Sequence, residues 1–170
     1  MSSQSSHTES VVRNIRLARA SDALALAKLR YAFRSSTGDA IEDENSFVER
    51  CGPWMAEHLN EGSLWRCWVA EQNQTLIGTL WLQLIEKIPN PTSELEYHAY
   101  ITSVYVCDWA RGKGIGSELL STALTWCKTA GAHAVILWSR ERSRPLYERH
   151  GFAVHSDLLE LLVEEAARDR

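Results

Sequence analysis

The chain has 170 residues, of which 45% are hydrophobic and 24% charged, as is typical of a globular protein with one domain. Its net charge of -4 gives no broad basic surface, so nucleic acid is not an expected partner. No apolar run has membrane-spanning length and the N-terminus lacks a signal-peptide core, which predicts a soluble cytoplasmic protein without a membrane partner. The four cysteines include no C-x-x-C pair, so neither a metal site nor a disulfide framework is expected.

The first half of the chain has patterns typical of a mixed α/β domain. Residues 1–10 are polar and serine-rich, and we expect a disordered leader there, followed by one domain over residues 11–170. Periodicity predicts a strand over 11–18, a helix from Ser21 or Asp22 to Gly38, a helix over 46–59, and two strands over 64–70 and 75–85 that form a hairpin. Gly52-Pro53 is expected to bend or split the second helix. Trp65, Trp68 and Trp81 lie in the hairpin, where such residues more often form core than a ligand platform.

An acidic loop follows the first helix and contains Asp39, Glu42, Asp43 and Glu44. Two interpretations stay open. A solvated linker that also starts the next helix is the more common origin of such a run. The sharper interpretation is a lip that attracts a cationic amine, such as a polyamine, an aminoglycoside or a lysine side chain, because loops on a rigid scaffold often carry specificity.

The second half of the chain alternates strands and helices. An irregular segment over 88–93 is followed by a strand over 94–106, a helix from Gly116 to Lys128, a strand over 134–139, a helix over 144–150, and closing strands over 152–155 and 157–164. The last of these segments is equally compatible with a helix by composition. This order predicts an α/β fold with helices on both faces of one sheet of about seven strands.

A glycine-rich loop joins the strand that ends at Val106 to the following helix. Its residues are Arg111, Gly112, Lys113, Gly114, Ile115 and Gly116. Strand, glycine loop and helix together offer free amides and a positive dipole end to an anion, and glycine lets the anion approach the backbone closely. The two basic residues add charge at the mouth of the loop. The pattern therefore predicts a phosphate-binding site.

The spacing of this loop matches neither Gly-x-x-x-x-Gly-Lys-Ser/Thr nor Gly-x-Gly-x-x-Gly. It fits Arg/Gln-x-x-Gly-x-Gly/Ala, with Arg111, Gly114 and Gly116 at the defining positions. A second motif, Leu-Tyr-x-x-x-Gly-Phe, occupies residues 146–152. In this order the two motifs resemble the GCN5-related N-acetyltransferase (GNAT) family, and the resemblance covers about residues 12–163.

The resemblance implies a mixed, mostly antiparallel sheet and an enzyme that moves an acetyl group from acetyl-CoA directly to a primary amine of a small molecule or protein. The glycine-rich loop would bind the pyrophosphate of the cofactor. The pantetheine arm would lie like an extra strand between the strand that ends at Val106 and the strand over 134–139. Backbone groups near Tyr105 and Val106 would contact it, and an amide there would polarise the thioester carbonyl.

Two proton transfers are expected of this chemistry. The resemblance implies that Tyr147 is the general acid for the leaving thiolate, and the alternative is a packing role for this ring. In relatives a carboxylate near the start of the strand that ends at Val106 often acts as the general base. The corresponding position here is near Tyr100, which is not a carboxylate. By alternation His98 and Glu96 share a face of the strand with Tyr100, so either is a candidate base, and water as the proton acceptor is an equal alternative.

One departure from the family pattern concerns the cofactor arm. Arg140 stands where many relatives have an asparagine that contacts the arm, so Ser139 or Ser143 is a candidate to supply that hydrogen bond. A non-catalytic acyl-CoA-binding or sensing module on the same fold is the alternative function, because fold does not fix function. Family members are often dimers, so a homodimer is an open possibility.

Overall fold

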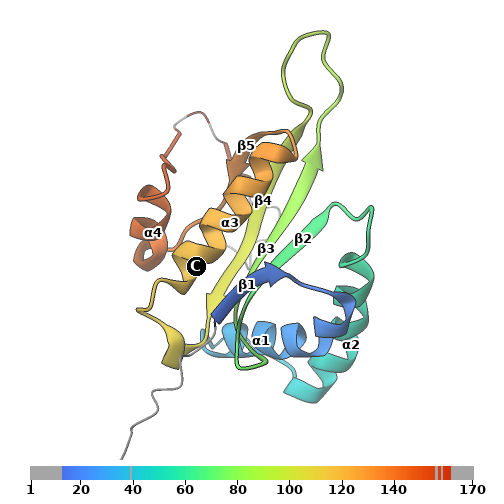
Figure 1. The fold of residues 1–170 in the computed structure, drawn as a ribbon, viewed down its shortest axis with the longest axis vertical. Helices are drawn as coiled ribbons and strands as arrows, with labels where there is room; N and C mark the ends of the chain where they lie inside the picture. Colours follow the sequence, from blue (N-terminus) through green and yellow to red (C-terminus); the bar gives the residue numbers. More distant parts are fainter. Residues whose placement is uncertain (1–12, 39, 156, 158, 162–170) are drawn as a thin grey trace, which may run out of the picture. The chain divides into compact units, whose positions relative to one another are not determined.

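The computed structural model describes residues 13–38, 40–155, 157 and 159–161. They belong to two compact units, one that ends at Trp138 and one that begins at Ser139 (Figure 1). The leader expected over residues 1–10 lies outside the described residues, and the single domain over residues 11–170 stays a prediction.

The described part of the first unit is built on one five-stranded sheet. Its strands, in spatial as well as chain order, are β1 (Arg13–Leu17), β2 (Trp65–Gln72), β3 (Thr75–Glu86), β4 (Tyr97–Val106) and β5 (Ala132–Ile136). The first four are antiparallel neighbours, and β5 is parallel to β4. Asn73 and Gln74 have φ of 49° and 62°, the left-handed backbone that a two-residue hairpin turn requires. The mixed, mostly antiparallel sheet and the β2–β3 hairpin are therefore confirmed.

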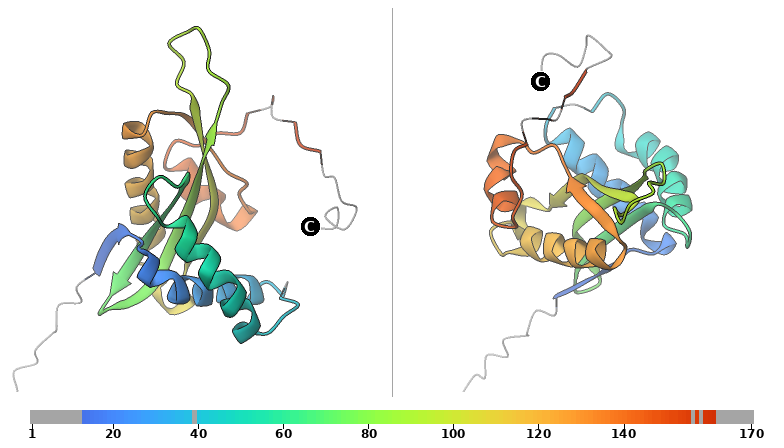
Figure 2. Two further views of the ribbon diagram at one scale, coloured as in Figure 1. Left: turned by 90° about the vertical axis from the view of Figure 1, so that its right-hand side faces the viewer. Right: turned by 90° about the horizontal axis from the view of Figure 1, so that it is seen from above.

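Helices cover both faces of the sheet (Figure 2). On one face α1 (Ala23–Ser35) and α2 (Glu44–His58) pack on Cys67, Val69 and Trp81. On the other face lies α3 (Ile115–Thr129), whose Ile115 and Leu119 meet β3 at Gly78. Short 3₁₀ turns occur at Ala20–Asp22 and Asp108–Ala110. Among the described helices, none is both long and apolar enough to cross a membrane.

Two carboxylates of the acidic loop, Glu42 and Asp43, have partners at the start of α2, whereas Asp39 lies outside the described residues. The Asp43 carboxylate accepts hydrogen bonds from the amides of Asn45 and Ser46, at 3.0 and 3.1 Å, and so caps the helix, which begins at Glu44 rather than Ser46. Glu42 forms an ion pair with Arg50. These two carboxylates therefore serve the helix start, and α2 runs unbroken through Pro53 instead of being split there.

Of the about seven strands expected, the described residues form five, so seven strands are not seen. Residues 152–155 form no strand: Ala153, Val154 and His155 are exposed, and only Phe152 is partly buried, with its ring centroid 5.8 Å from that of Tyr147. The short alternation of apolar and polar residues in this segment reflects one packed aromatic side chain and not a strand paired in a sheet. The strand expected over 157–164 lies partly outside the described residues, and residues 157 and 159–161 are not in a strand.

The second unit contains a 3₁₀ turn at Glu141–Ser143 and the short helix α4 (Arg144–Glu148). The helix expected over 144–150 is thus present, two residues shorter at its end. Its first turn contains Pro145, which is favoured there because its missing N–H would have no partner in the helix.

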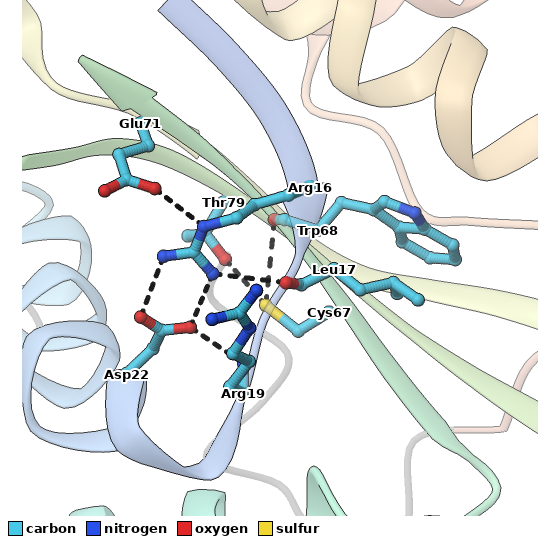
Figure 3. Close-up of polar contacts among 8 residues, drawn as sticks. All are labelled: Arg16, Leu17, Arg19, Asp22, Cys67, Trp68, Glu71 and Thr79. Carbon is cyan, nitrogen blue, oxygen red and sulfur yellow. Dashed lines mark hydrogen bonds and ion pairs between the residues drawn. The ribbon is translucent and has the colours of Figure 1, made fainter. Parts of the chain in front are cut away.

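An ion cluster on β1 ties the first strand to its neighbours (Figure 3). The Arg16 guanidinium donates to both oxygens of Asp22, at 2.8 and 3.0 Å, and to Glu71 on β2, at 2.6 Å. Asp22 also accepts the amide of Arg19, at 2.7 Å. The side chains of Arg16 and Asp22 are only 21% and 13% exposed, so water screens the pair weakly. The cluster therefore joins β1, β2 and the start of α1.

We predict that Asp22→Asn lowers the free energy of unfolding at pH 7 by about 2 kcal/mol, because it removes a charged partner from hydrogen bonds to Arg16. The hydrogen bond from Arg16 holds the pKa of Asp22 below its ordinary value. The stabilisation is therefore complete above the unfolded-state pKa, about 3.9, and is lost as the pH falls through the lower folded-state pKa.

Urea unfolding followed by tryptophan fluorescence at pH 7 and pH 3 measures both effects. Wild type should lose more stability than Asp22→Asn over this interval, and the exposed control Glu57→Gln should change stability by less than about 0.5 kcal/mol at pH 7. Equal pH dependence in wild type and Asp22→Asn would contradict the role given to this carboxylate.

Candidate functional site

The glycine-rich loop ends at an uncapped helix terminus. Gly112 and Gly114 have φ of 76° and 78°, and Gly114 is the residue at which α3 starts. No side chain of the described residues caps this end, and the first bond of the helix runs from the Glu118 amide to the Gly114 carbonyl, at 3.0 Å. The amides of Ile115 and Gly116 therefore have no acceptor within the helix and point out of its positive end.

Glycine is required at position 114 by its backbone conformation rather than by space. A Cβ atom there would meet only the Glu118 carboxylate, at 3.9 Å, which is an ordinary contact. The φ of 78° is the left-handed region that other L-residues adopt only at a cost. The geometry of the loop thus depends on this glycine.

Basic side chains surround the loop and hold it. Arg111 donates through Nε to the Val106 carbonyl, at 3.0 Å, and its guanidinium lies 2.7 Å from the Asp108 carboxylate. Lys113 lies over the Trp109 ring, 5.8 Å from its centroid. Both cations therefore stand at the mouth of an amide-lined site, where they attract an anion.

Arg13 on β1 is a loop contact that sequence reasoning missed. It donates to the Lys113 carbonyl, at 3.3 Å, and forms an ion pair with Glu118 in the first turn of α3. The pair offsets the negative charge of Glu118 beside the anion site. No motif marks this arginine, because it comes from a strand about a hundred residues earlier in the chain.

Strands β4 and β5 pair only at one end. β5 residues are matched to Tyr97–Tyr100, and β5 ends at Ile136, opposite Tyr100. Within the described residues, β4 from Ile101 to Val106 has no strand on this side. We call this stretch the open edge of β4. It runs directly toward the glycine-rich loop, so an extended molecule bound along it would meet the helix terminus.

The direction of the backbone groups follows from the β3–β4 pairing. The Cys107 amide donates to the Ile77 carbonyl on β3, at 2.9 Å, and hydrogen-bonded residues alternate along an antiparallel pair. The backbone groups of Ser103 and Tyr105 therefore face β3, and those of Val104 and Val106 face the open edge. Sequence reasoning named Tyr105 and Val106 as contacts; the pairing places Val106 on the open edge and adds Val104.

A β-bulge at Thr102 changes which side chains share a face of β4. Ser103 is opposite Trp81, but Ile101 is opposite Leu82, so Thr102 is an extra residue. Residues directly opposite each other point to the same face, and Ser103 therefore points to the face that α1 and α2 cover. The simple alternation assumed from sequence fails at this point.

The candidate bases lie toward the start of β4. Glu96 precedes the strand and is exposed. His98 is partly buried beside His133, with ring centroids 5.7 Å apart, and its pKa is lowered first by burial and then by Lys87 and His133. His98 is four residues from Thr102, about 13 Å along an extended strand. The structure does not bring these two side chains next to the bulge.

An aromatic pocket of about 330 Å³ lies on the face covered by α1 and α2. It is lined by α1, α2 and the three central strands through Arg30, Phe47, Cys51, Trp54, Met55, Trp65, Trp81, Thr102 and Ser103. Phe47, Cys51 and Trp54 recur at helical spacing and form one side of α2. No sequence motif predicted this pocket.

Aromatic packing holds the pocket walls. The Trp54 ring contacts Trp65 edge-on, with centroids 5.3 Å apart, and lies 6.1 Å from Trp81. On its other side it stacks on His58, with centroids 3.9 Å apart. Burial raises the pKa of the Cys51 thiol, which keeps it neutral and a poor nucleophile. The part of the lining formed by these rings and Cys51 is therefore apolar and supplies no reactive nucleophile.

The other predicted site residues belong to the second unit. Tyr147 is 9% exposed, and burial raises the pKa of its hydroxyl. Ser143 donates to the Arg140 carbonyl, at 2.9 Å, and Ser139 is partly buried. Among the described residues, no cluster of three or more His, Cys, Asp or Glu side chains is arranged to hold a metal ion, and a reaction without metal stays a prediction.

Comparison with known proteins agrees with this geometry. The acetyltransferase (GNAT) family model matches residues 28–152, well over half of the chain. A predicted acetyltransferase from Clostridium acetobutylicum, solved with acetyl-CoA, is 25% identical with a TM-score of 0.69, over 89% of this chain and 96% of its own. No curated protein sequence matches.

Two further solved structures share the fold. A GCN5-related N-acetyltransferase from Ralstonia eutropha JMP134 is 23% identical with a TM-score of 0.67, over 90% of this chain and 100% of its own. The ribosomal-protein-alanine N-acetyltransferase from Brucella melitensis biovar Abortus 2308 is 20% identical with a TM-score of 0.63, over 90% and 99%. The chain therefore belongs to the GNAT acetyltransferase family and is an N-acetyltransferase that uses acetyl-CoA.

Proposed function

We propose that the protein transfers the acetyl group directly to a primary amine of a small molecule or protein that enters the aromatic pocket. The open edge of β4 carries this proposal, because it connects the glycine-rich loop to the bulge at Thr102 that lines the pocket. In the reaction the amine nitrogen attacks the thioester carbonyl carbon. The N–C bond forms, the C–S bond breaks, the amine loses one proton, and the thiolate gains one to give CoA.

The cofactor would be held by backbone groups. The amides of Ile115 and Gly116 fit a pyrophosphate at the positive end of α3, and Arg111 and Lys113 add charge there. The arm would pair along the open edge as an added strand, with Val104 and Val106 as partners. One of these two amides would then stabilise the oxyanion that forms on the thioester carbonyl. Ser139 or Ser143 would supply a further hydrogen bond to the arm.

Tyr147 would protonate the leaving thiolate. Its raised pKa keeps the hydroxyl protonated at neutral pH, as a general acid requires. His98 or Glu96 would accept the amine proton only through a chain of water molecules, because both lie far along β4 from the bulge. Direct loss of the proton to water is the simpler route.

Calorimetric titration with acetyl-CoA, followed by a thiol-release assay against a panel of amines, tests the proposal. We expect micromolar binding and release of CoA with at least one amine. Binding without release across the panel would favour the sensing module. Absence of binding would refute the assignment of the glycine-rich loop.

We predict that Gly114→Ala weakens acetyl-CoA binding by about tenfold, because an L-residue at φ 78° costs about 1–2 kcal/mol and shifts the loop amides. Titration calorimetry measures the Kd. The matched control is Gly62→Ala, which also replaces a glycine at positive φ, of 84°, but outside the loop. If both variants bind acetyl-CoA as wild type does, the loop does not hold the cofactor.

We predict that Tyr147→Phe lowers kcat by about 100-fold, the lower end of the effect of a general acid, with acetyl-CoA affinity nearly unchanged. Steady-state thiol release and calorimetry measure the two quantities. Tyr97→Phe removes a hydroxyl elsewhere in the chain and should leave kcat unchanged. If kcat is unaltered in Tyr147→Phe, Tyr147 is not the general acid and its ring serves only in packing.

A further inference from the structure

Arg30 supplies the positive charge of the aromatic pocket. It extends from α1, is partly buried, and donates to the Ser103 hydroxyl at 3.4 Å. Its guanidinium also lies over the Phe33 ring, 5.7 Å from the centroid. Burial lowers the pKa of this group from its ordinary value, yet that value is so high that the arginine stays charged.

Among the described residues, no carboxylate forms an ion pair with Arg30. Within the described part of the chain Arg30 forms no ion pair, and the residues that line the pocket include no aspartate or glutamate. A partly desolvated cation without a counter-ion is costly, and an anionic ligand would recover that cost through charge-assisted hydrogen bonds. The planar guanidinium matches the two oxygens of a carboxylate.

Two carboxylates of the acidic loop are already bound within the protein. Asp43 is engaged by the amides of Asn45 and Ser46, and Glu42 by Arg50. Polycationic acceptors such as polyamines would instead meet the Arg30 charge inside the pocket, with no acidic lining residue to offset the repulsion. The pocket therefore disfavours the cationic acceptors that the loop sequence suggested.

The aromatic part of the pocket suits the apolar part of a ligand. Phe47, Trp54 and Trp65 line the pocket and present rings to a bound molecule. A volume of about 330 Å³ is at the small end of ligand sites, enough for a small molecule with one ring but not for a large one. Thr102 and Ser103 place the polar end of the pocket at the bulge of β4, next to the open edge.

We propose that the acceptor is an amino-acid-like amine, whose carboxylate is bound by Arg30 and whose apolar side chain lies among the rings of Phe47, Trp54 and Trp65. This inference rests on the proposed function, since the amine of such a molecule must reach the acetyl group beside the bulge. The products are the N-acetylated acid and CoA, by the bond changes given above.

A binding experiment tests the recognition without turnover. We expect 3-phenylpropanoate to bind the acetyl-CoA-saturated enzyme at least about tenfold more tightly than 3-phenylpropanamide, which has the same shape without the charge. Arg30→Gln should abolish this preference, and Arg30→Lys should restore part of it. The control Lys28→Gln removes an exposed cation from the same helix and should leave the preference intact. Equal binding of acid and amide to wild type, or no binding of either at millimolar concentration, would overturn the inference.

Turnover separates this inference from the proposed function. Thiol release should be faster with phenylalanine than with phenethylamine or spermidine, and the advantage should vanish in Arg30→Gln. Preference for either amine without a carboxylate would overturn the acceptor class while leaving the enzyme an acetyltransferase. A protein that does not bind acetyl-CoA in the same calorimeter would refute the proposed function itself.

Discussion

The site depends on one constraint: along the open edge of β4, the backbone has no partner strand among the described residues. Buried backbone amides and carbonyls normally all find partners. β3 pairs with one side of β4 on both sides of the bulge, but β5 ends opposite Tyr100, so no strand among the described residues pairs with Val104 and Val106 on the other side. Of their four groups, the Val106 carbonyl accepts Arg111. The remaining groups suit an extended ligand rich in amides, such as a pantetheine arm.

In our proposal the same strand contacts the second substrate, the acceptor amine, through its side chains. The bulge at Thr102 turns Ser103 toward the α1–α2 face, where Trp81 and Arg30 meet it. The proposed function assigns the edge of β4 to the cofactor and its α1–α2 face to the acceptor, and their reacting groups would meet near the bulge. A bulge is a common device for aiming side chains near functional sites. It explains how a regular sheet can bind a cofactor and an acceptor side by side.

Local signals in the sequence predicted much of this arrangement. The glycine-rich loop, the helix that follows it, the hairpin of β2 and β3, and the family motifs could be recognised because each depends on residues close in sequence. The start of α2 at Glu44 is within two residues of the prediction, since capping is also local.

Features that depend on contacts between residues far apart in the chain could not be predicted from the sequence. The bulge at Thr102 has no local mark in the sequence, so simple alternation from Glu96 cannot be extended past it to Ser103. Arg13 and Arg30 act through partners about a hundred and about seventy residues away, and no pattern links such pairs. Trp81 was expected in the core and is 5% exposed, yet it also lines the pocket, so core and ligand wall are not exclusive roles. The strand expected over 152–155 is absent because alternation over four residues does not supply a partner strand.

Amide hydrogen exchange measured by NMR, with and without acetyl-CoA, tests the role of the open edge most directly. In the free protein the Ser103 and Tyr105 amides, which face β3, should exchange slowly, and those of Val104 and Val106 should exchange fast. Saturation with acetyl-CoA should slow exchange at Val104 and Val106 while leaving Ser103 and Tyr105 nearly unchanged. Slow exchange at Val104 and Val106 in the free protein, or no change on saturation, would contradict the account.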